Sequence, residues 1–287
     1  MQNSTFQNLK RALLLDVDTE TLTKQRKYES PFIQFQIDML LHKDKLDASR
    51  IYAASFSNIK EISKKSRDEV VVTYILFLAN IVKYEKLNRT FLRPGAWIGE
   101  CAWTQTLKIV TYCVITLIYD IKWNSNYFFH LDFMISELLQ GKADAVRNFF
   151  QKLKIQSFTS TPFPIERDVE MLQFQNTDDF GPYYWRLLHW MAEAFNMRHG
   201  HDDVQLAKSL WQDFVSKVMY RTLRCMMCIN HYQMITHDLK DRLMNSNNYP
   251  KLWFDIHNIV RKSQNKPVYT LEEFEKDSQA MKSVLQA

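Results

Sequence analysis

The sequence predicts an all-α protein, and three observations carry that prediction. Apolar residues recur at intervals of three and four along most of the 287-residue chain, which is the spacing of one face of an α-helix. No stretch alternates apolar and polar residues around a hairpin turn, the pattern that would predict strands. With 46% hydrophobic residues and only 5 glycines and 7 prolines, the composition is typical of a folded helical protein and not of a disordered one.

In the first half of the chain, helices are expected wherever this spacing persists between turn residues. The expected ranges are 31–45, 67–86, 104–121 and 127–154, the last with a break near Gly141. Pro94 and Gly95 interrupt the pattern, so 89–100 is expected to be a loop. The apolar runs from Val70 and Ile109 are shorter than the roughly 20 residues that cross a bilayer. We therefore expect core helices and no membrane insertion.

A domain boundary is expected near residue 160, because residues 157–168 are rich in Ser, Thr and Pro and lack helical spacing. Residues 1–160 would form a helical N-terminal domain that serves packing or dimerisation, and residues 161–287 a four- or five-helix bundle. The expected bundle helices are one with Pro182 in its first turn that ends near Met197, then 204–221, 225–243 and 251–262. Short polar connections between them favour antiparallel packing.

Charge and motif content exclude several functional classes. The net charge of +5 comes from 37 basic and 32 acidic residues without a block of like charges, so no nucleic-acid binding is expected. The chain has neither the GxGxxG nor the GxxxxGKS/T pattern, so a dinucleotide would have to bind without a Rossmann fold. The first 20 residues lack the order of charged, apolar and small residues that marks a signal peptide.

Cys225 and Cys228 form a CxxC motif, and three interpretations of it are open. The thiols could be inert core residues, ligands of a structural zinc ion together with His231 and His237, or a redox-active pair. On one helix these four side chains point in different directions, so zinc would need a ligand from another helix. The redox interpretation explains the spacing, because one helical turn brings the two sulfurs within bonding distance.

Aromatic residues and histidines gather on two other expected helices. Trp185 and His189 are four residues apart, so both project from one face of the first bundle helix. The last expected helix and the segment after it carry a second group, which consists of His257, Val260, Arg261 and Lys266. Each of these residues alone is most simply a core or surface residue. The combination of these two groups with the CxxC motif indicates a functional site.

The segments "GPYYWRLLHWMAEAF", "CMMCINHY" and "IHNIVRKSQNKP" follow the order of motifs in the FAD-linked sulfhydryl oxidases of the Erv/ALR type. The chain resembles that family over about residues 178–267, and it is most similar to the branch found in baculoviruses and related insect DNA viruses. The resemblance implies a helical bundle that holds FAD beside the CxxC motif, with no metal. The cofactor-binding residues that it implies are Trp185, His189, His231, His257, Asn258, Val260, Arg261 and Lys266.

The activity implied by the resemblance is thiol oxidation. A protein dithiol would attack Cys225, and Cys228 would pass electrons to FAD and on to O2, giving H2O2. The resemblance also implies a homodimer and a viral protein inside the host cell, in the nucleus or cytoplasm or in the virion. The chain departs from the family pattern in the two residues before the CxxC motif, at Phe195 and at Arg261, whose planar fork suits a pyrophosphate.

Two other classes are consistent with the residues: a zinc-stabilised helical interaction module and a structural protein of a virion. Cys101 and Cys113 are not expected to form a shuttle disulfide, because twelve residues of one helix separate them by about 18 Å. Cys113 lies in an apolar run and is expected in the core.

Overall fold

A computed structural model describes residues 66–88, 100–142, 144–155, 177–223, 231–232, 234–235, 241–242 and 246–287. Throughout these residues the regular structure is helical, with eight α-helices, one 3-10 helix and no strand. The prediction of an all-α protein is therefore confirmed. The expected helix at 31–45, the expected boundary near residue 160 and the CxxC motif lie outside the described residues.

The helices span most of the described residues. Their bounds are α5 (Arg67–Asn88), α6 (Glu100–Tyr119), α7 (Ser125–Leu139), α8 (Ala145–Lys152), α10 (Thr177–Met197), α11 (Asp202–Lys217), the 3-10 helix η4 (Met219–Thr222), α14 (Tyr249–Ser263) and α15 (Leu271–Gln286).

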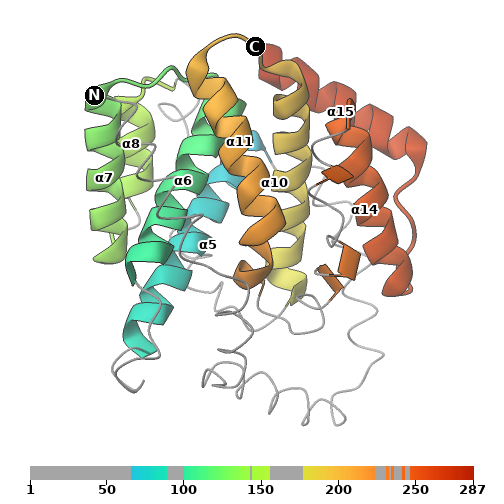
Figure 1. Cartoon of the computed structure of the whole chain (residues 1–287), viewed down its shortest axis with the longest axis horizontal. Helices are drawn as coiled ribbons and strands as arrows, with labels where there is room; N and C mark the ends of the chain where they lie inside the picture. The colour runs from blue at the N-terminus through green and yellow to red at the C-terminus, as the bar shows by residue number, and fades with distance from the viewer. Residues whose placement is uncertain are drawn as a thin grey trace.

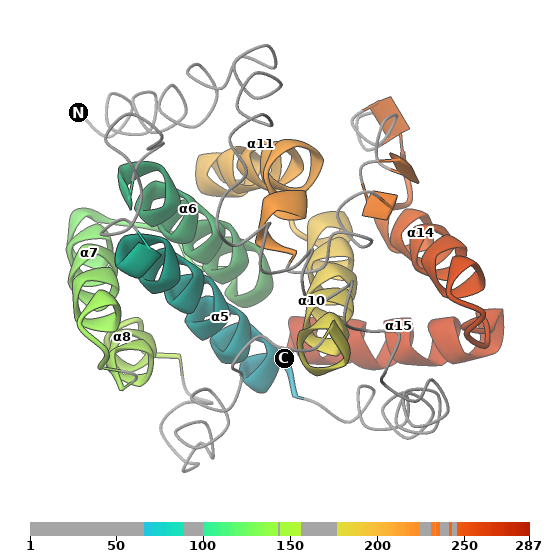
Figure 2. The same cartoon turned by 90° about the horizontal axis from the view of Figure 1, so that it is seen from below.

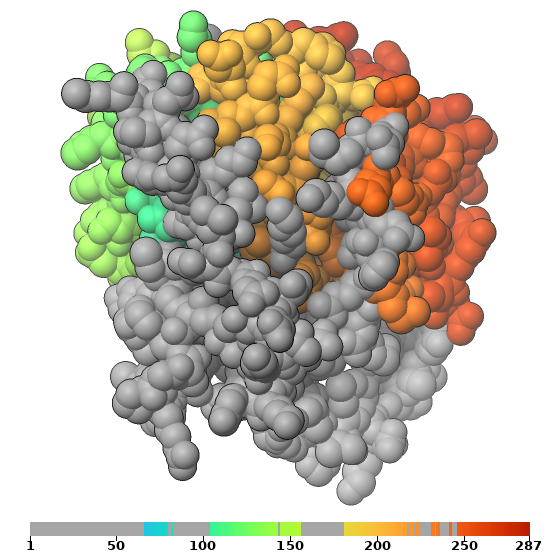
Figure 3. All heavy atoms as spheres, viewed as in Figure 1, coloured from blue at the N-terminus to red at the C-terminus, as the bar shows by residue number. Residues whose placement is uncertain are grey.

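The helix α10 lies at the centre of the arrangement (Figure 1). The helices α7 and α8 pack against each other and against α5, while α6 packs against α5, α10 and α11. The helices α14 and α15 both pack against α10 on the side away from α7 (Figure 2). In the space-filling view, α7 and α14 accordingly occupy opposite sides of the molecule (Figure 3).

One hydrophobic core runs through helices on both sides of the expected boundary. Its largest fully buried side chains include Tyr74 of α5, Tyr112 of α6, Trp211 of α11 and Trp253 of α14. Burial of such aromatic surface is the main favourable term for folding. The long apolar helices are part of this core, and among the described helices none has the length and hydropathy needed to span a bilayer.

Local sequence explains several helix ends. Gly141 adopts φ 97° between α7 and α8, a conformation that side chains other than hydrogen disfavour. This confirms the expected break there. The side chain of Asn248 accepts a hydrogen bond from the Lys251 backbone at the start of α14, and Thr270 and Glu273 form a reciprocal capping box at the start of α15. Such caps satisfy backbone N–H groups that a helix leaves unpaired.

Two elements differ from expectation. The helix α10 begins at Thr177, so Pro182 lies inside it and not in its first turn. The packing of α10 against four other helices stabilises the extra turn despite the hydrogen bond that proline cannot make. The helix α15 was not expected, although Thr270 and Glu273 are three residues apart in a capping-box pattern and Phe274, Met281 and Leu285 are buried.

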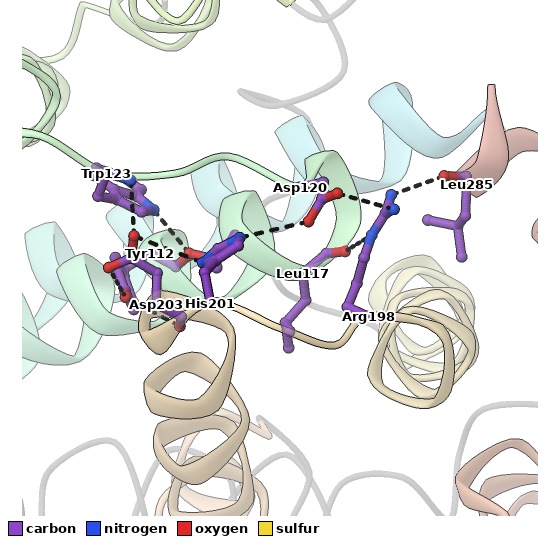
Figure 4. Close-up of polar contacts among 9 residues, drawn as sticks. Tyr112, Leu117, Asp120, Trp123, Arg198, His201, Asp203 and Leu285 are labelled. Carbon is purple, nitrogen blue, oxygen red and sulfur yellow. Dashed lines mark hydrogen bonds and ion pairs between the residues drawn. The ribbon is translucent and has the colours of Figure 1, made fainter.

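Asp203 joins the first turn of α11 to the α6–α7 connection (Figure 4). Its carboxylate accepts hydrogen bonds from the Tyr112 hydroxyl at 3.2 Å and from the Trp123 backbone N–H at 3.0 Å. Burial and the Asp203 charge raise the pKa of Tyr112, so the phenol stays neutral and donates. The Trp123 indole N–H donates in turn to the Thr116 hydroxyl at 2.8 Å.

Arg198, just after the last turn of α10, connects α10 to the ends of α6 and α15 (Figure 4). Its guanidinium donates to the Leu117 carbonyl of α6 at 3.1 Å and to the Leu285 carbonyl of α15 at 2.8 Å. It also forms an ion pair with Asp120 at 3.3 Å. Both carbonyls belong to the last turn of a helix, where a cation is stabilising. Arg198 therefore ties α6 and α15 to the end of α10.

We expect Asp203→Ala to lower the free energy of unfolding by about 1–3 kcal/mol. The variant leaves the part-buried Trp123 backbone N–H without its acceptor and removes one acceptor of the Tyr112 hydroxyl, which keeps the Asp203 backbone carbonyl. The measurement is the urea midpoint of unfolding. The control is Asp202→Ala, since Asp202 is exposed in the same helical turn, and this variant should unfold close to the wild-type midpoint. Equal midpoints for the two variants would contradict the assigned role of Asp203.

Candidate functional site

The site is formed where α10 packs against α14. Trp185 and His189 project from α10, and the indole of Trp185 stacks on the imidazole of His257 from α14, with ring centroids 4.1 Å apart and planes 8° from parallel. The packing of these two helices brings the predicted residues of both segments into contact. The i, i+4 spacing on α10 is what allows Trp185 and His189 to reach one partner residue.

His189 and His257 form a hydrogen-bonded pair. The Nε2 atom of His189 lies 3.1 Å from Nδ1 of His257. Burial, and secondarily the charge of Arg186, lowers the pKa of His189 to about 3. Burial also lowers the pKa of His257, with further contributions from His189, Arg261 and Lys266. Both rings are therefore neutral near pH 7, and one donates its N–H to the lone pair of the other.

Asn258 closes the connection between α14 and α15. Its side-chain amide donates to the Tyr269 carbonyl at 2.8 Å and accepts from the Tyr269 backbone N–H at 2.8 Å. The Asn258 side-chain amide thus donates one hydrogen bond and accepts another, as the N–H and C=O groups of a paired backbone do. Asn258 therefore fixes the segment that follows α14, and it does so from a position next to His257.

The basic residues of the predicted site lie at the end of α14 and just after it. Arg261 is buried, and its Nε donates to the Pro267 carbonyl. The Lys266 backbone N–H donates to the Arg261 carbonyl at 2.9 Å. Both positive charges contribute to the lowered pKa of His257, which means that they act at the imidazole. Val260, half-buried on α14, accepts a hydrogen bond from Ser263 through its carbonyl at 2.7 Å.

His231 lies at the C-terminal end of α14 and not at the histidine pair. Its Nδ1 is 3.2 Å from the Ser263 hydroxyl. Six residues, or about 9 Å along the helix axis, separate Ser263 from His257. Cys225 and Cys228 are outside the described residues, and His231 follows Cys228 by three positions in the sequence. His231, three residues after the CxxC motif, therefore contacts α14 at its last residue.

The remaining cysteines behave as the sequence predicts. Cys101 and Cys113 both fall within α6, so twelve residues of continuous helix place them about 18 Å apart, beyond the reach of a disulfide. Cys113 is free and fully buried, which confirms its place in the core. Burial raises the pKa of its thiol well above the ordinary value.

Sequence reasoning missed Tyr269. Its ring centroid lies 6.0 Å from both His189 and His257, and its hydroxyl donates to Asp277 at 2.7 Å. Asp277 also forms an ion pair with the buried Arg186 of α10 at 3.2 Å. The sequence signal that could have identified Tyr269 is its position, since it is an aromatic residue two positions after Pro267, at the end of the last predicted motif. Asp277 had no such signal, because an acidic residue on an amphipathic helix is usually solvated.

These residues suit a flat anionic ligand. Aromatic rings offer stacking surfaces, and Arg261 and Lys266 supply positive charge beside them. Because Trp185 and His257 are already in direct contact, a third ring would have to stack on the outer face of this pair or separate it. Comparisons of the chain with protein-family models, curated proteins and solved structures find no match.

Proposed function

We propose that the chain is an FAD-linked thiol oxidase that forms disulfide bonds in proteins. The observation that carries the proposal is the contact of Trp185 with His257 and of His257 with His189. These are the residues that the resemblance assigns to the cofactor, and they come from segments 68 residues apart. A bundle of α10, α11, α14 and α15 with the CxxC segment would hold the cofactor.

The described residues fit FAD in chemistry. The Trp185, His189 and His257 rings would pack against its flat ring systems, because neutral aromatic rings stack well. Asn258 and Val260 would shape the wall beside them, and His231 would stand on the side of the CxxC motif. Arg261 and Lys266 would attract the pyrophosphate. When bound, FAD would supply the oxidising capacity, because it can accept two electrons that originate from a dithiol and pass them to O2, which becomes H2O2.

The chain's own cysteines would handle the thiol exchange. A substrate thiolate attacks the Cys225 sulfur of the Cys225–Cys228 disulfide, and Cys228 leaves as a thiolate. The second substrate thiolate then attacks the substrate sulfur of the mixed disulfide, which releases an oxidised substrate and the Cys225 thiolate. Arg224 next to Cys225 favours that thiolate. Two substrate thiols are thereby oxidised and the enzyme pair is reduced.

The neutral histidine pair has a defined part in this arrangement. Because burial holds the pKa of His189 at about 3 and lowers that of His257, neither ring carries charge near pH 7. The two neutral rings therefore offer an aromatic surface to the cofactor. One ring uses an N–H and the other a lone pair in the His189–His257 hydrogen bond. Protein dithiols and O2 are the proposed substrates, and the proposed active form is a homodimer inside an infected cell.

The visible absorption spectrum of the purified full-length chain tests the function. We expect a yellow protein whose flavin bands bleach when a small dithiol is added and recover as O2 is consumed. The alternative is a zinc-stabilised helical module. That function predicts a colourless protein that releases zinc in stoichiometric amount on denaturation, with Cys225 and Cys228 as ligands.

A further inference from the structure

Tyr269 covers the histidine pair from the segment between α14 and α15. Its ring lies 6.0 Å from His189, at 65° in an edge-on arrangement, and 6.0 Å from His257 at 50°. It also packs against Phe254 of α14, with centroids 5.7 Å apart. Trp185 stacks on His257 directly. The pair is therefore bounded by two larger aromatic rings, of which only Trp185 belongs to a predicted motif.

Tyr269 is held at both of its ends. The two hydrogen bonds from the Asn258 amide fix its backbone at 2.8 Å each. Its hydroxyl donates to the Asp277 carboxylate of α15 at 2.7 Å and makes a longer contact of 3.3 Å with the Glu273 carbonyl. The same carboxylate oxygen accepts from the Arg186 guanidinium of α10 at 3.2 Å. One tyrosine thus links the three helices that surround the pair.

The protonation states keep this network in place. Burial and the Asp277 charge raise the pKa of Tyr269, so its hydroxyl remains a donor at all ordinary pH values. The positive charge of Arg186 offsets the negative charge of Asp277 inside the interface, where the Arg186 side chain is only 7% exposed. Such a part-buried ion pair adds little stability compared with apolar residues of similar size. What it does supply is a fixed direction for the Tyr269 hydroxyl.

We infer that Arg186 and Asp277 are positioning residues for the candidate site, which act through Tyr269. The Arg186–Asp277 pair orients the Tyr269 hydroxyl, and the Tyr269 ring then holds the His189–His257 pair so that His257 stacks on Trp185. Support of this kind lowers the cost of ordering side chains when a ligand binds. The inference rests on the proposed function for the identity of that ligand, which is FAD.

Two conservative variants of the full-length chain test the network. Tyr269→Phe keeps the ring and removes the hydroxyl, and Asp277→Asn keeps the side-chain shape and removes the charge. The first readout is the side-chain ¹⁵N NMR spectrum of histidine-labelled protein, recorded without added FAD. We expect the signals of His189 and His257 to shift in both variants. In the control Asp132→Asn, on an exposed position of α7, they should not.

The second readout is the dissociation constant for FAD. Loss of the hydroxyl in Tyr269→Phe, and loss of the charge that strengthens the same hydrogen bond in Asp277→Asn, should each weaken FAD binding by roughly tenfold. Because both changes act on the same hydrogen bond, the double variant should bind FAD no more weakly than Tyr269→Phe alone. A network that served only folding would lower the melting temperature and leave the histidine signals in place.

The outcomes separate this inference from the proposed function. If the wild-type chain binds no FAD, the proposed function fails, while the histidine spectra still decide whether the network positions the pair. If FAD binds and the two variants have wild-type histidine signals and wild-type affinity, the positioning role is wrong and the oxidase assignment stands. Additive losses in the double variant would likewise overturn the inference, because they would mean that Tyr269 and Asp277 act separately.

Discussion

Replacing Cys228 with serine is expected to abolish thiol oxidation and to leave flavin binding intact. The reason is that in the proposed mechanism the second sulfur of the CxxC pair passes the electrons of the dithiol to the flavin, and a serine hydroxyl cannot carry out thiol–disulfide exchange. The residues proposed to hold FAD, such as Trp185 and His257, are unchanged in this variant. The measurements are O2 consumption with a reduced protein substrate and the flavin absorbance per protein.

The matched control for this variant is Cys113→Ala. Cys113 is fully buried in α6 and free, so its removal should leave the rate per bound flavin unchanged even if the protein becomes less stable by about 1 kcal/mol. A Cys228→Ser variant that still oxidised dithiols at the wild-type rate would refute the proposed mechanism. A colourless wild-type chain whose Cys228→Ser variant loses its fold would instead favour the zinc-stabilised module.

Acidification below pH 6.5 is expected to destabilise the fold through the histidine pair. The pKa of His189 is lowered from 6.5 to about 3, so an unfolded chain takes up a proton at a pH at which the folded chain does not. The stabilising contribution is complete above pH 6.5 and is lost as the pH falls towards 3. For each such histidine, the free energy of unfolding falls by up to about 1.4 kcal/mol per pH unit.

Urea unfolding at a series of pH values between 7 and 4 measures this effect. His189→Gln keeps a hydrogen-bonding partner for His257 and removes the titrating ring, so the pH dependence should become shallower by about one proton. His199→Gln is the control, because His199 is exposed, and it should follow the wild-type curve. Parallel curves for His189→Gln and the wild type would show that the pair does not control acid stability.

Much of the fold and part of the site could be predicted from local sequence. Helix positions follow from apolar spacing, and the break at Gly141 follows from the glycine itself, which reaches the observed positive φ without strain. The shared face of Trp185 and His189 follows from the helical repeat. Each of these depends on residues only a few positions apart, and at that range the geometry of the backbone determines which side chains are neighbours.

The start of α10 and the presence of α15 were harder to predict, because both depend on packing against residues that are distant in the sequence. The extra turn of α10 before Pro182 contradicts the local preference of proline, and tertiary packing decides it. The capping box of α15 was visible, but nothing local showed that Ser278, Met281 and Leu285 would be buried. Propensity is worth tenths of a kcal/mol for ordinary residues and about 3 kcal/mol for an interior proline, whereas burial of each apolar side chain is worth about 1.5–3 kcal/mol. Burial of several side chains therefore outweighs propensity at both helices.

The sequence by itself determined that the chain is helical, which residues can carry thiol, aromatic and cationic chemistry, and that Cys101 and Cys113 cannot pair within one helix. Only the tertiary structure decided that His189 meets His257, that Asn258 is used to hold Tyr269, and that Asp277 reaches Arg186 across 91 residues. The physical reason is that these contacts depend on how α10, α14 and α15 cross. That crossing is fixed by the fit of many buried side chains at once.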